Sequence, residues 1–185
     1  LRLSLLLVLA FLLGAPGMRV RTGSSDGNFT ALLLDNSASM TLEDVAVGGR
    51  TSTRLDAERQ AAFGGEGSDG LIKSLGEVGQ VITYGFADAT KRLQRPAQLD
   101  GRGPSTGIFR AIKDVDTELQ AAPLSSVVMI TDGCRNVGGS AADAAAMLQA
   151  RGIPLYILGL GNPTPPANLE VVQVLAPERV RRNSG

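Results

Sequence analysis

The sequence predicts an α/β fold, a three-layer sandwich in which helices flank a mostly parallel central sheet (Rossmann-like). Segments of strand composition alternate with segments of helical composition between residues 29 and 161. Several of the strand segments are apolar without interruption, which is typical of strands covered on both faces. The 185 residues suit one domain of ordinary size with appendages.

The predicted elements follow one another in the order strand, helix, strand, helix, strand, helix, strand. Helices are indicated by apolar residues at spacings of three and four, and strands by short apolar runs. The Gly-rich stretch 64–70 ends the first helix and is interpreted as a flexible linker. The predicted strands are 29–34 (FTALLL), 80–86 (QVITYGF), 125–131 (SSVVMIT) and 153–161 (IPLYILGLG), and the predicted helices are 53–63, 105–122 and 140–152.

Composition excludes several classes of function. Lys and Arg number 18 and so do Asp and Glu, and this zero net charge argues against a nucleic-acid-binding protein. The chain has no histidine, which removes the commonest general base and the usual zinc ligand. The single cysteine, Cys134, permits no internal disulfide. Beside Asp132 it could be a partly exposed, reactive thiol, but we favour its interpretation as a small filler residue. No catalytic residue and no cofactor-binding motif is predicted, and a P-loop is absent from the sequence.

The two ends of the sequence differ from the alternating middle. Residues 1–16 hold an unbroken apolar run from Leu5 to Leu13, and three interpretations are open: part of a transmembrane helix, a signal-peptide core, or a buried core segment. We favour a membrane anchor followed by a linker at 17–27, with the side of the membrane undecided. The domain itself is placed at 28–162. Residues 163–185 are expected to be a linker or the start of a further domain, and they include a strand-like piece, LEVVQVL.

Polar oxygen-bearing side chains follow the predicted strands where each strand ends. Asp35, Ser37 and Ser39 follow the first strand, and Asp132 follows the strand at 125–131. Thr106 lies in the loop that leads into the long helix, at the start of the segment 105–122. Because ligands gather at the carboxyl ends of the strands in open α/β sheets, these side chains are expected to converge at one edge.

Hydroxyl and carboxylate oxygens are hard ligands that suit Mg²⁺, Mn²⁺ or Ca²⁺. Neutral hydroxyl ligands leave the ion most of its positive charge, so an acidic group from a partner is expected as its last ligand. Each feature alone has an ordinary interpretation. Asp35 and Ser37 could cap a helix near Ser39, Thr106 could cap the long helix, and Asp132 with Gly133 is a common turn pair.

Three of these motifs together resemble the metal-ion-dependent adhesion site (MIDAS) of von Willebrand factor type A (VWA) domains. They are DNSAS at 35–39, the threonine of GPSTG at 103–107 and ITDG at 130–133, and IPLYILGLGN resembles the last central strand of that family. The likeness covers residues 28–162. Because an apolar segment precedes these motifs, the sequence also resembles the membrane-anchored bacterial members of the family.

The resemblance implies a role for each of five residues. Ser37 and Ser39 would bind the ion through their hydroxyls, and Thr106 directly or through water. Asp35 and Asp132 would hold it largely through bridging waters. The expected function is a metal-dependent protein-binding module, not an enzyme. Two alternatives remain: a magnesium-dependent phosphotransferase or phosphatase that uses Asp35, and a structural subunit of a membrane assembly that works with an ATPase.

Overall fold

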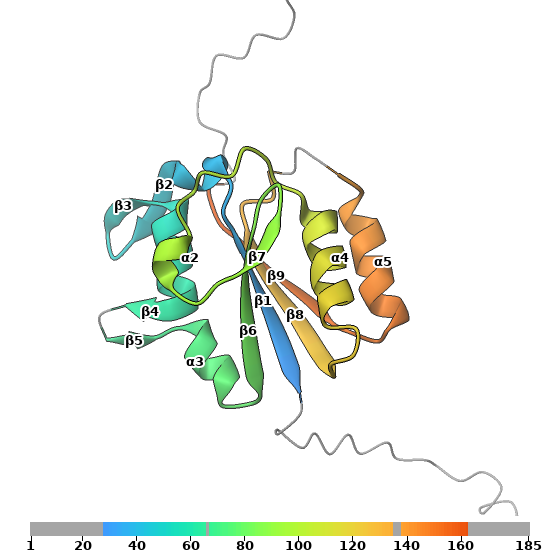
Figure 1. Cartoon of the computed structure of the whole chain (residues 1–185). Helices are drawn as coiled ribbons and strands as arrows, with labels where there is room; N and C mark the ends of the chain where they lie inside the picture. The colour runs from blue at the N-terminus through green and yellow to red at the C-terminus, as the bar shows by residue number, and fades with distance from the viewer. Residues whose placement is uncertain (1–27, 66, 135–137, 163–185) are drawn as a thin grey trace, which may run out of the picture.

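The computed structural model describes residues 28–65, 67–134 and 138–162. Its centre is a five-stranded sheet with the strand order β7-β6-β1-β8-β9 (Figure 1). β1 lies in the middle and runs parallel to both of its neighbours, β9 runs parallel to β8, and β7 alone is antiparallel. The predicted mostly parallel sheet is therefore confirmed. The strands of this sheet are β1 (Phe29–Asp35), β6 (Gln80–Phe86), β7 (Thr90–Arg92), β8 (Leu124–Thr131) and β9 (Leu155–Gly159).

Helices cover both faces of the sheet, which gives three layers (Figure 1). On one face lie α4 (Ile108–Glu118) and α5 (Ala141–Ala150), and on the other lie α2 (Arg54–Phe63) and α3 (Leu71–Gly76). The short 3-10 helices η1 (Ala38–Thr41) and η2 (Pro96–Gln98) lie in connections. The predicted sandwich is thus confirmed in its layers as well as in its sheet.

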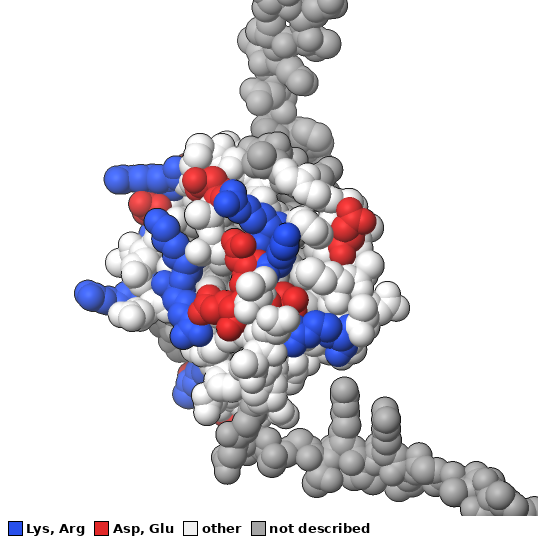
Figure 2. Space-filling model, turned by 45° about the vertical axis from the view of Figure 1, so that its right-hand side comes forward, with Lys and Arg blue, Asp and Glu red and all other residues white. Residues whose placement is uncertain are grey.

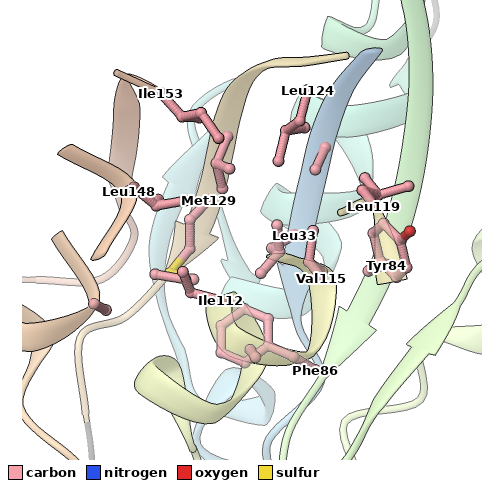
Figure 3. Packing of buried hydrophobic residues seen from close by; sticks show 14 of the residues in the cluster. Leu33, Tyr84, Phe86, Ile112, Val115, Leu119, Leu124, Met129, Leu148 and Ile153 are labelled. Carbon is pink, nitrogen blue, oxygen red and sulfur yellow. The ribbon is translucent and has the colours of Figure 1, made fainter. Parts of the chain in front are cut away.

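The side chains of β1 divide the core into two parts because successive residues of a strand point to opposite faces. Ala31 and Leu33 pack with the helices α4 and α5, and Figure 3 shows Leu33 among Met129, Ile112 and Val115. Leu32 and Leu34 pack on the other face, with residues of α2 and α3. All four β1 residues have no exposed surface. This burial fixes the strand, and therefore the point at which Asp35 emerges from it.

The predicted helices and strands all occur, with boundary differences of a few residues. The helix expected at 105–122 is shorter, because α4 begins after its N-cap Gly107. The interpretation of 64–70 as a linker is wrong for the described residues, since β4 (Gly64–Gly65) and β5 (Ser68–Asp69) pair antiparallel there. A second antiparallel pair, β2 (Glu43–Val47) with β3 (Arg50–Thr53), was not predicted either.

The predicted anchor at 1–16, the linker at 17–27 and the segment at 163–185 lie outside the described residues. In the part of the chain that the structure describes, no helix has the length and apolar character needed to cross a membrane. The domain boundaries therefore stay predictions.

Candidate metal centre

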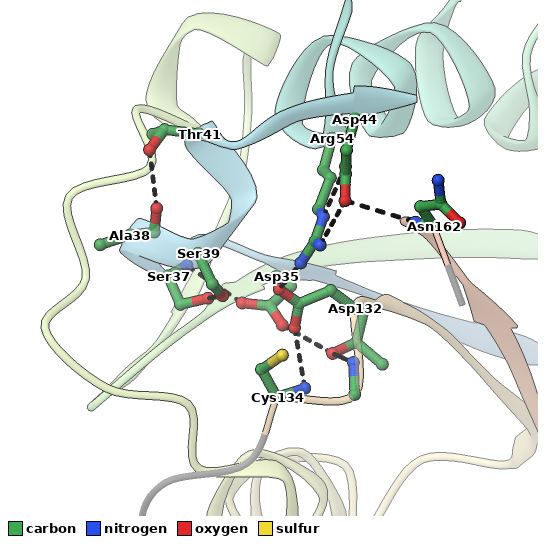
Figure 4. Close-up of polar contacts among 12 residues, drawn as sticks. Asp35, Ser37, Ala38, Ser39, Thr41, Asp44, Arg54, Asp132, Cys134 and Asn162 are labelled. Carbon is green, nitrogen blue, oxygen red and sulfur yellow. Dashed lines mark hydrogen bonds and ion pairs between the residues drawn. The ribbon is translucent and has the colours of Figure 1, made fainter. Parts of the chain in front are cut away.

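The first part of the site is the turn that follows β1. Asp35 is the last residue of that strand, and the chain then bends into η1, with Ser37 as the residue before the helix. The backbone N–H of Ser37 donates to Oδ1 of Asp35 at 3.0 Å. This bond holds the turn so that the hydroxyls of Ser37 and Ser39 lie 2.9 Å apart (Figure 4). The two serines predicted from the sequence are thus brought together.

The loop that carries Thr106 is fastened to the same turn. The N–H of Gly103 donates to the carbonyl of Asn36 at 2.9 Å, and the N–H of Ala38 donates to the carbonyl of Gly103 at 2.8 Å. Gly103 is required there, because an added Cβ would lie 2.2 Å from the Cβ of Ala87. As a result, Thr106 lines one pocket of about 210 Å³ with both serines of the turn.

The second carboxylate comes from the end of β8. The side chain of Asp132 has no exposed surface, and both of its oxygens have partners. Oδ2 accepts a hydrogen bond from Nη1 of Arg54 at 2.7 Å, and Oδ1 accepts from the N–H of Cys134 at 2.9 Å. Gly133 supplies the turn with a φ of 73°. Figure 4 shows Asp132 facing the turn of Asp35 and the two serines.

Asp35 is the most enclosed member of the set, with no exposed surface. Its Oδ2 accepts a hydrogen bond from the hydroxyl of Thr131 at 2.6 Å, and its N–H donates to Oε1 of Glu58 at 2.7 Å. Burial raises the pKa of Asp35, the hydrogen bonds from Thr131 and Ser37 oppose that rise, and the charge of Asp132 adds to it. Positive charge near this carboxylate would therefore stabilise its ionised form.

Glu58 was not predicted as part of the site. It lies on α2 with no exposed surface, and its Oε2 has no hydrogen-bond partner in the structure. Burial raises the pKa of Glu58 well above its ordinary value, and the charges of Asp35 and Asp132 add to the rise. Three carboxyl groups thus lie under one edge of the sheet.

Arg54 is the second residue that the sequence interpretation missed. Besides Asp132 it binds Asp44, with Nε to Oδ1 at 2.8 Å and Nη2 to Oδ2 at 2.5 Å. The guanidinium lowers the pKa of Asp44 to about 2. Arg54 is the first residue of α2, where a cation opposes the helix dipole. That unfavourable position was the available signal that Arg54 has a specific acidic partner.

The sequence also allows simpler roles for these residues, as helix caps, as a turn or as a filler, and the structure agrees with only one of them. Ser37 precedes η1 but makes no capping bond through its side chain, and the N-cap of α4 is Gly107 and not Thr106. The turn at Asp132 and Gly133 does form, together with the contacts to Arg54. Cys134 is exposed at the rim of the pocket, which does not fit its interpretation as a small filler residue.

The donor set fits a hard divalent cation. Its hydroxyl and carboxylate oxygens are the ligands that Mg²⁺, Mn²⁺ and Ca²⁺ prefer. No group of three or more His, Cys, Asp or Glu side chains suited to a metal occurs within the described ranges. The predicted site has only two carboxylates, those of Asp35 and Asp132, and hydroxyls supply its remaining oxygens. Its geometry therefore permits a site in which most direct ligands are neutral.

Among the comparisons with known proteins, only those with solved structures find similarity to this chain. No family model matches the sequence, and neither does any curated protein. An aerotolerance-related membrane protein from Bacteroides fragilis, solved with multiple mutations to serine, superposes with a TM-score of 0.53 at 24% identity, covering 83% of this chain and 78% of that one. Manganese-loaded TRAP from Plasmodium vivax gives 0.52 at 18%, covering 73% of this chain and 57% of that one.

A third solved structure, proximal thread matrix protein 1 from the mussel byssus, gives a TM-score of 0.50 at 16% identity over 73% of this chain and 38% of that one. Identities this low show the fold alone. Together with the sheet order and the helices on both faces, they confirm the fold that the resemblance predicts. The chain has the fold of a von Willebrand factor type A domain.

Proposed function

We propose that this domain is a metal-ion-dependent protein-binding module that binds an acidic group of a partner through a bound divalent cation. The observation that carries the proposal is the pair of hydroxyls of Ser37 and Ser39, 2.9 Å apart in one pocket with Thr106. Two buried carboxylates, Asp35 and Asp132, lie at the ends of the adjacent strands β1 and β8. Helix capping does not explain the serine pair, because Ser37 makes no capping bond through its side chain.

In this proposal Ser37, Ser39 and Thr106 hold Mg²⁺, Mn²⁺ or Ca²⁺ through their hydroxyl oxygens. Asp35 and Asp132 hold it through water, and the contacts that already occupy their oxygens support an indirect role. The similar protein TRAP from Plasmodium vivax is described as manganese-loaded, and this supports a divalent ion as the ligand in the proposal. Bound in this way, the ion keeps most of its positive charge and attracts a carboxylate.

A protein partner suits the surface better than a nucleic acid does. Acidic and basic side chains are interspersed on the face shown in Figure 2, and the chain has no net charge. Nucleic-acid binding normally needs a basic patch or stripe. Enzymatic phosphotransfer from Asp35 would need a second acidic residue two positions on, where the chain has Ser37. We therefore assign no catalytic residue.

Attachment to a membrane belongs to the same proposal. The apolar residues 1–16 would form the anchor, and the similar protein from Bacteroides fragilis is described as a membrane protein. Membrane fractions from cells that produce the full chain should retain it after a high-salt wash and release it with detergent. Recovery of the full chain in the salt-washed supernatant would contradict the anchor.

Calorimetric titration with Mg²⁺ and with Mn²⁺ tests the ion directly. The parental chain should give a saturable heat, and Ser37→Ala and Asp35→Ala should abolish it while the fold is kept. Ser68→Ala, an exposed serine on β5, is the matched control and should bind as the parent does. Capture of a partner with the parental chain, with and without chelator, then tests the acidic-group mechanism. Equal heats for the parent and Ser37→Ala would overturn the assignment.

A further inference from the structure

A second hollow lies beside the metal pocket. It has a volume of about 450 Å³, compared with about 210 Å³ for the pocket that holds Ser37, Ser39 and Thr106. This volume falls within the range of about 300–1,000 Å³ that is usual for ligand sites. The end of β6, the strand β7, the 3-10 helix η2 and the loop at 102–104 contribute to its walls.

The two hollows share one wall, which consists of Gly103 and Pro104. Asn36 fastens this wall to the turn that carries the two serines. Its side-chain Oδ1 accepts from the N–H groups of Asp100 and Gly101, each at 2.8 Å, and its carbonyl accepts from the N–H of Gly103 at 2.9 Å. These hydrogen bonds fix the two hollows relative to each other, so one segment of a partner can reach into both.

The larger hollow is rich in hydrogen-bond donors that the protein itself leaves available. Lys91 is exposed and makes no ion pair within the described residues. The side chain of Arg102 is 86% exposed, and its ion pair with Asp100 is long, with Nε and Oδ2 3.9 Å apart. Gln98 turns its Oε1 toward two backbone N–H groups, at 2.6 and 2.9 Å, which leaves its Nε2 as a further donor.

The other charged residues of the hollow do not cancel these donors. Arg92 also lines it, but its Nε lies 2.5 Å from Oε1 of Glu118 and its guanidinium lies over the ring of Tyr84. Asp88 is exposed and contributes the single carboxylate among the described residues that line the hollow. The hollow therefore has more positive than negative charge and more donors than acceptors. A carboxylate suits it, because charge-assisted hydrogen bonds to a carboxylate are stronger than neutral ones.

We propose that this hollow is a second subsite for the partner, in which a second acidic side chain of the same segment binds. The inference rests on the proposed function, in which the first acidic group binds the ion. Lys91, Gln98 and Arg102 donate to the second carboxylate. In an extended segment, side chains two positions apart point the same way and lie about 7 Å apart, so closely spaced acidic residues suit two hollows with a common wall. The surface thus selects a segment with two acidic residues.

NMR titration of the full chain with blocked peptides tests the second subsite. The diacidic peptides consist of glycine and serine with two glutamates separated by one, two or three residues. In the matched monoacidic peptides, glutamine replaces the second glutamate. In excess Mg²⁺ at least one diacidic peptide should bind at least about tenfold more tightly than its match, because a hydrogen bond to a charged group contributes enough for that factor. The amide signals of Lys91, Gln98 and Arg102 should shift as this peptide binds.

A double variant, Lys91→Gln with Arg102→Gln, removes both available cations from the hollow. We expect the preference for the diacidic peptide to fall from at least about tenfold to less than about twofold. The matched control, Arg50→Gln with Lys113→Gln, removes the same two kinds of charge from exposed positions outside the hollow. It should keep the preference of the parent, which separates a local contact from a general effect of net charge.

The second subsite and the ion-dependent function fail in different ways. Equal affinities of the diacidic and monoacidic peptides for the parent in Mg²⁺ would overturn the second subsite alone. A tenfold preference that the double variant retains would do the same. Peptide binding that is equal in Mg²⁺ and in chelator, or no binding of any peptide in Mg²⁺, would contradict the proposed function and the second subsite with it.

Discussion

Replacement of Arg54 by Met tests how the buried charges at the sheet edge are balanced. The Arg54 side chain is 7% exposed and that of Asp132 is fully buried, with Nη1 and Oδ2 2.7 Å apart. Arg54→Met keeps the apolar stem of the side chain and removes the guanidinium. Asp132 is then left buried without its counter-charge, and removal of one partner of a buried ion pair costs about 3–5 kcal/mol.

A divalent cation should replace part of the lost interaction. Two unit charges about 4 Å apart interact by about 1–4 kcal/mol at the effective dielectric constants of water-exposed and partly buried sites. We therefore expect Mg²⁺ to raise the free energy of unfolding of Arg54→Met by at least about 1 kcal/mol more than it raises that of the parent. This difference is the specific signature of a cation near Asp132.

Urea denaturation in chelator and in excess Mg²⁺ measures both quantities. Lys73→Met is the matched control, because Lys73 pairs with Asp69 at 2.7 Å with both side chains more than 60% exposed. Such surface pairs contribute less than about 1 kcal/mol. The reasoning is refuted if Arg54→Met in chelator costs no more than Lys73→Met.

Three further substitutions probe the surroundings of the site. Burial raises the pKa of Glu58 well above its ordinary value, so the folded protein loses stability as the pH rises above the ordinary carboxyl value. Glu58→Gln has no such proton to lose, and its free energy of unfolding should therefore rise relative to that of the parent as the pH increases, measured by urea denaturation at each pH. Gly103→Ala should weaken Mg²⁺ binding and lower the melting temperature, because its Cβ would lie 2.2 Å from that of Ala87, whereas Gly76→Ala meets no atom within 4 Å and should change neither. Leu33 has no exposed surface, so Leu33→Ala should lower the free energy of unfolding by about 2–5 kcal/mol, measured by urea denaturation. A decrease of less than about 1 kcal/mol would contradict the place of Leu33 in the core.

The parts of the fold that could be predicted are those in which apolar burial determines the structure. The strand at 80–86 occurs with its predicted bounds, and Ile108, Ala111, Ile112 and Val115 form the buried face of α4. Asp35 and Asp132 were placed correctly at strand ends, since strands buried on both faces end where polar residues begin.

The parts that were missed depend on polar or turn chemistry. The β2–β3 pair turns at Gly48 and Gly49, both with positive φ. Its strands are short and none of their residues is buried, so a continuous apolar run does not reveal them. β7 consists of three polar residues. Arg54 and Glu58 lie within a predicted helix, but their partners are distant in sequence, and spacing within a helix cannot indicate them.

Paramagnetic broadening by Mn²⁺ tests most directly whether the strand-end oxygens meet around one ion. Substoichiometric Mn²⁺ is added to the isotope-labelled parental chain, and the amide signals are followed in two-dimensional NMR spectra. We predict that signals of Ser37, Ser39, Thr106 and Asp132 broaden first and together, and that Ser37→Ala removes the effect. Broadening centred on another region, such as the exposed carboxylates of α4, or equal broadening in Ser37→Ala, would contradict the account.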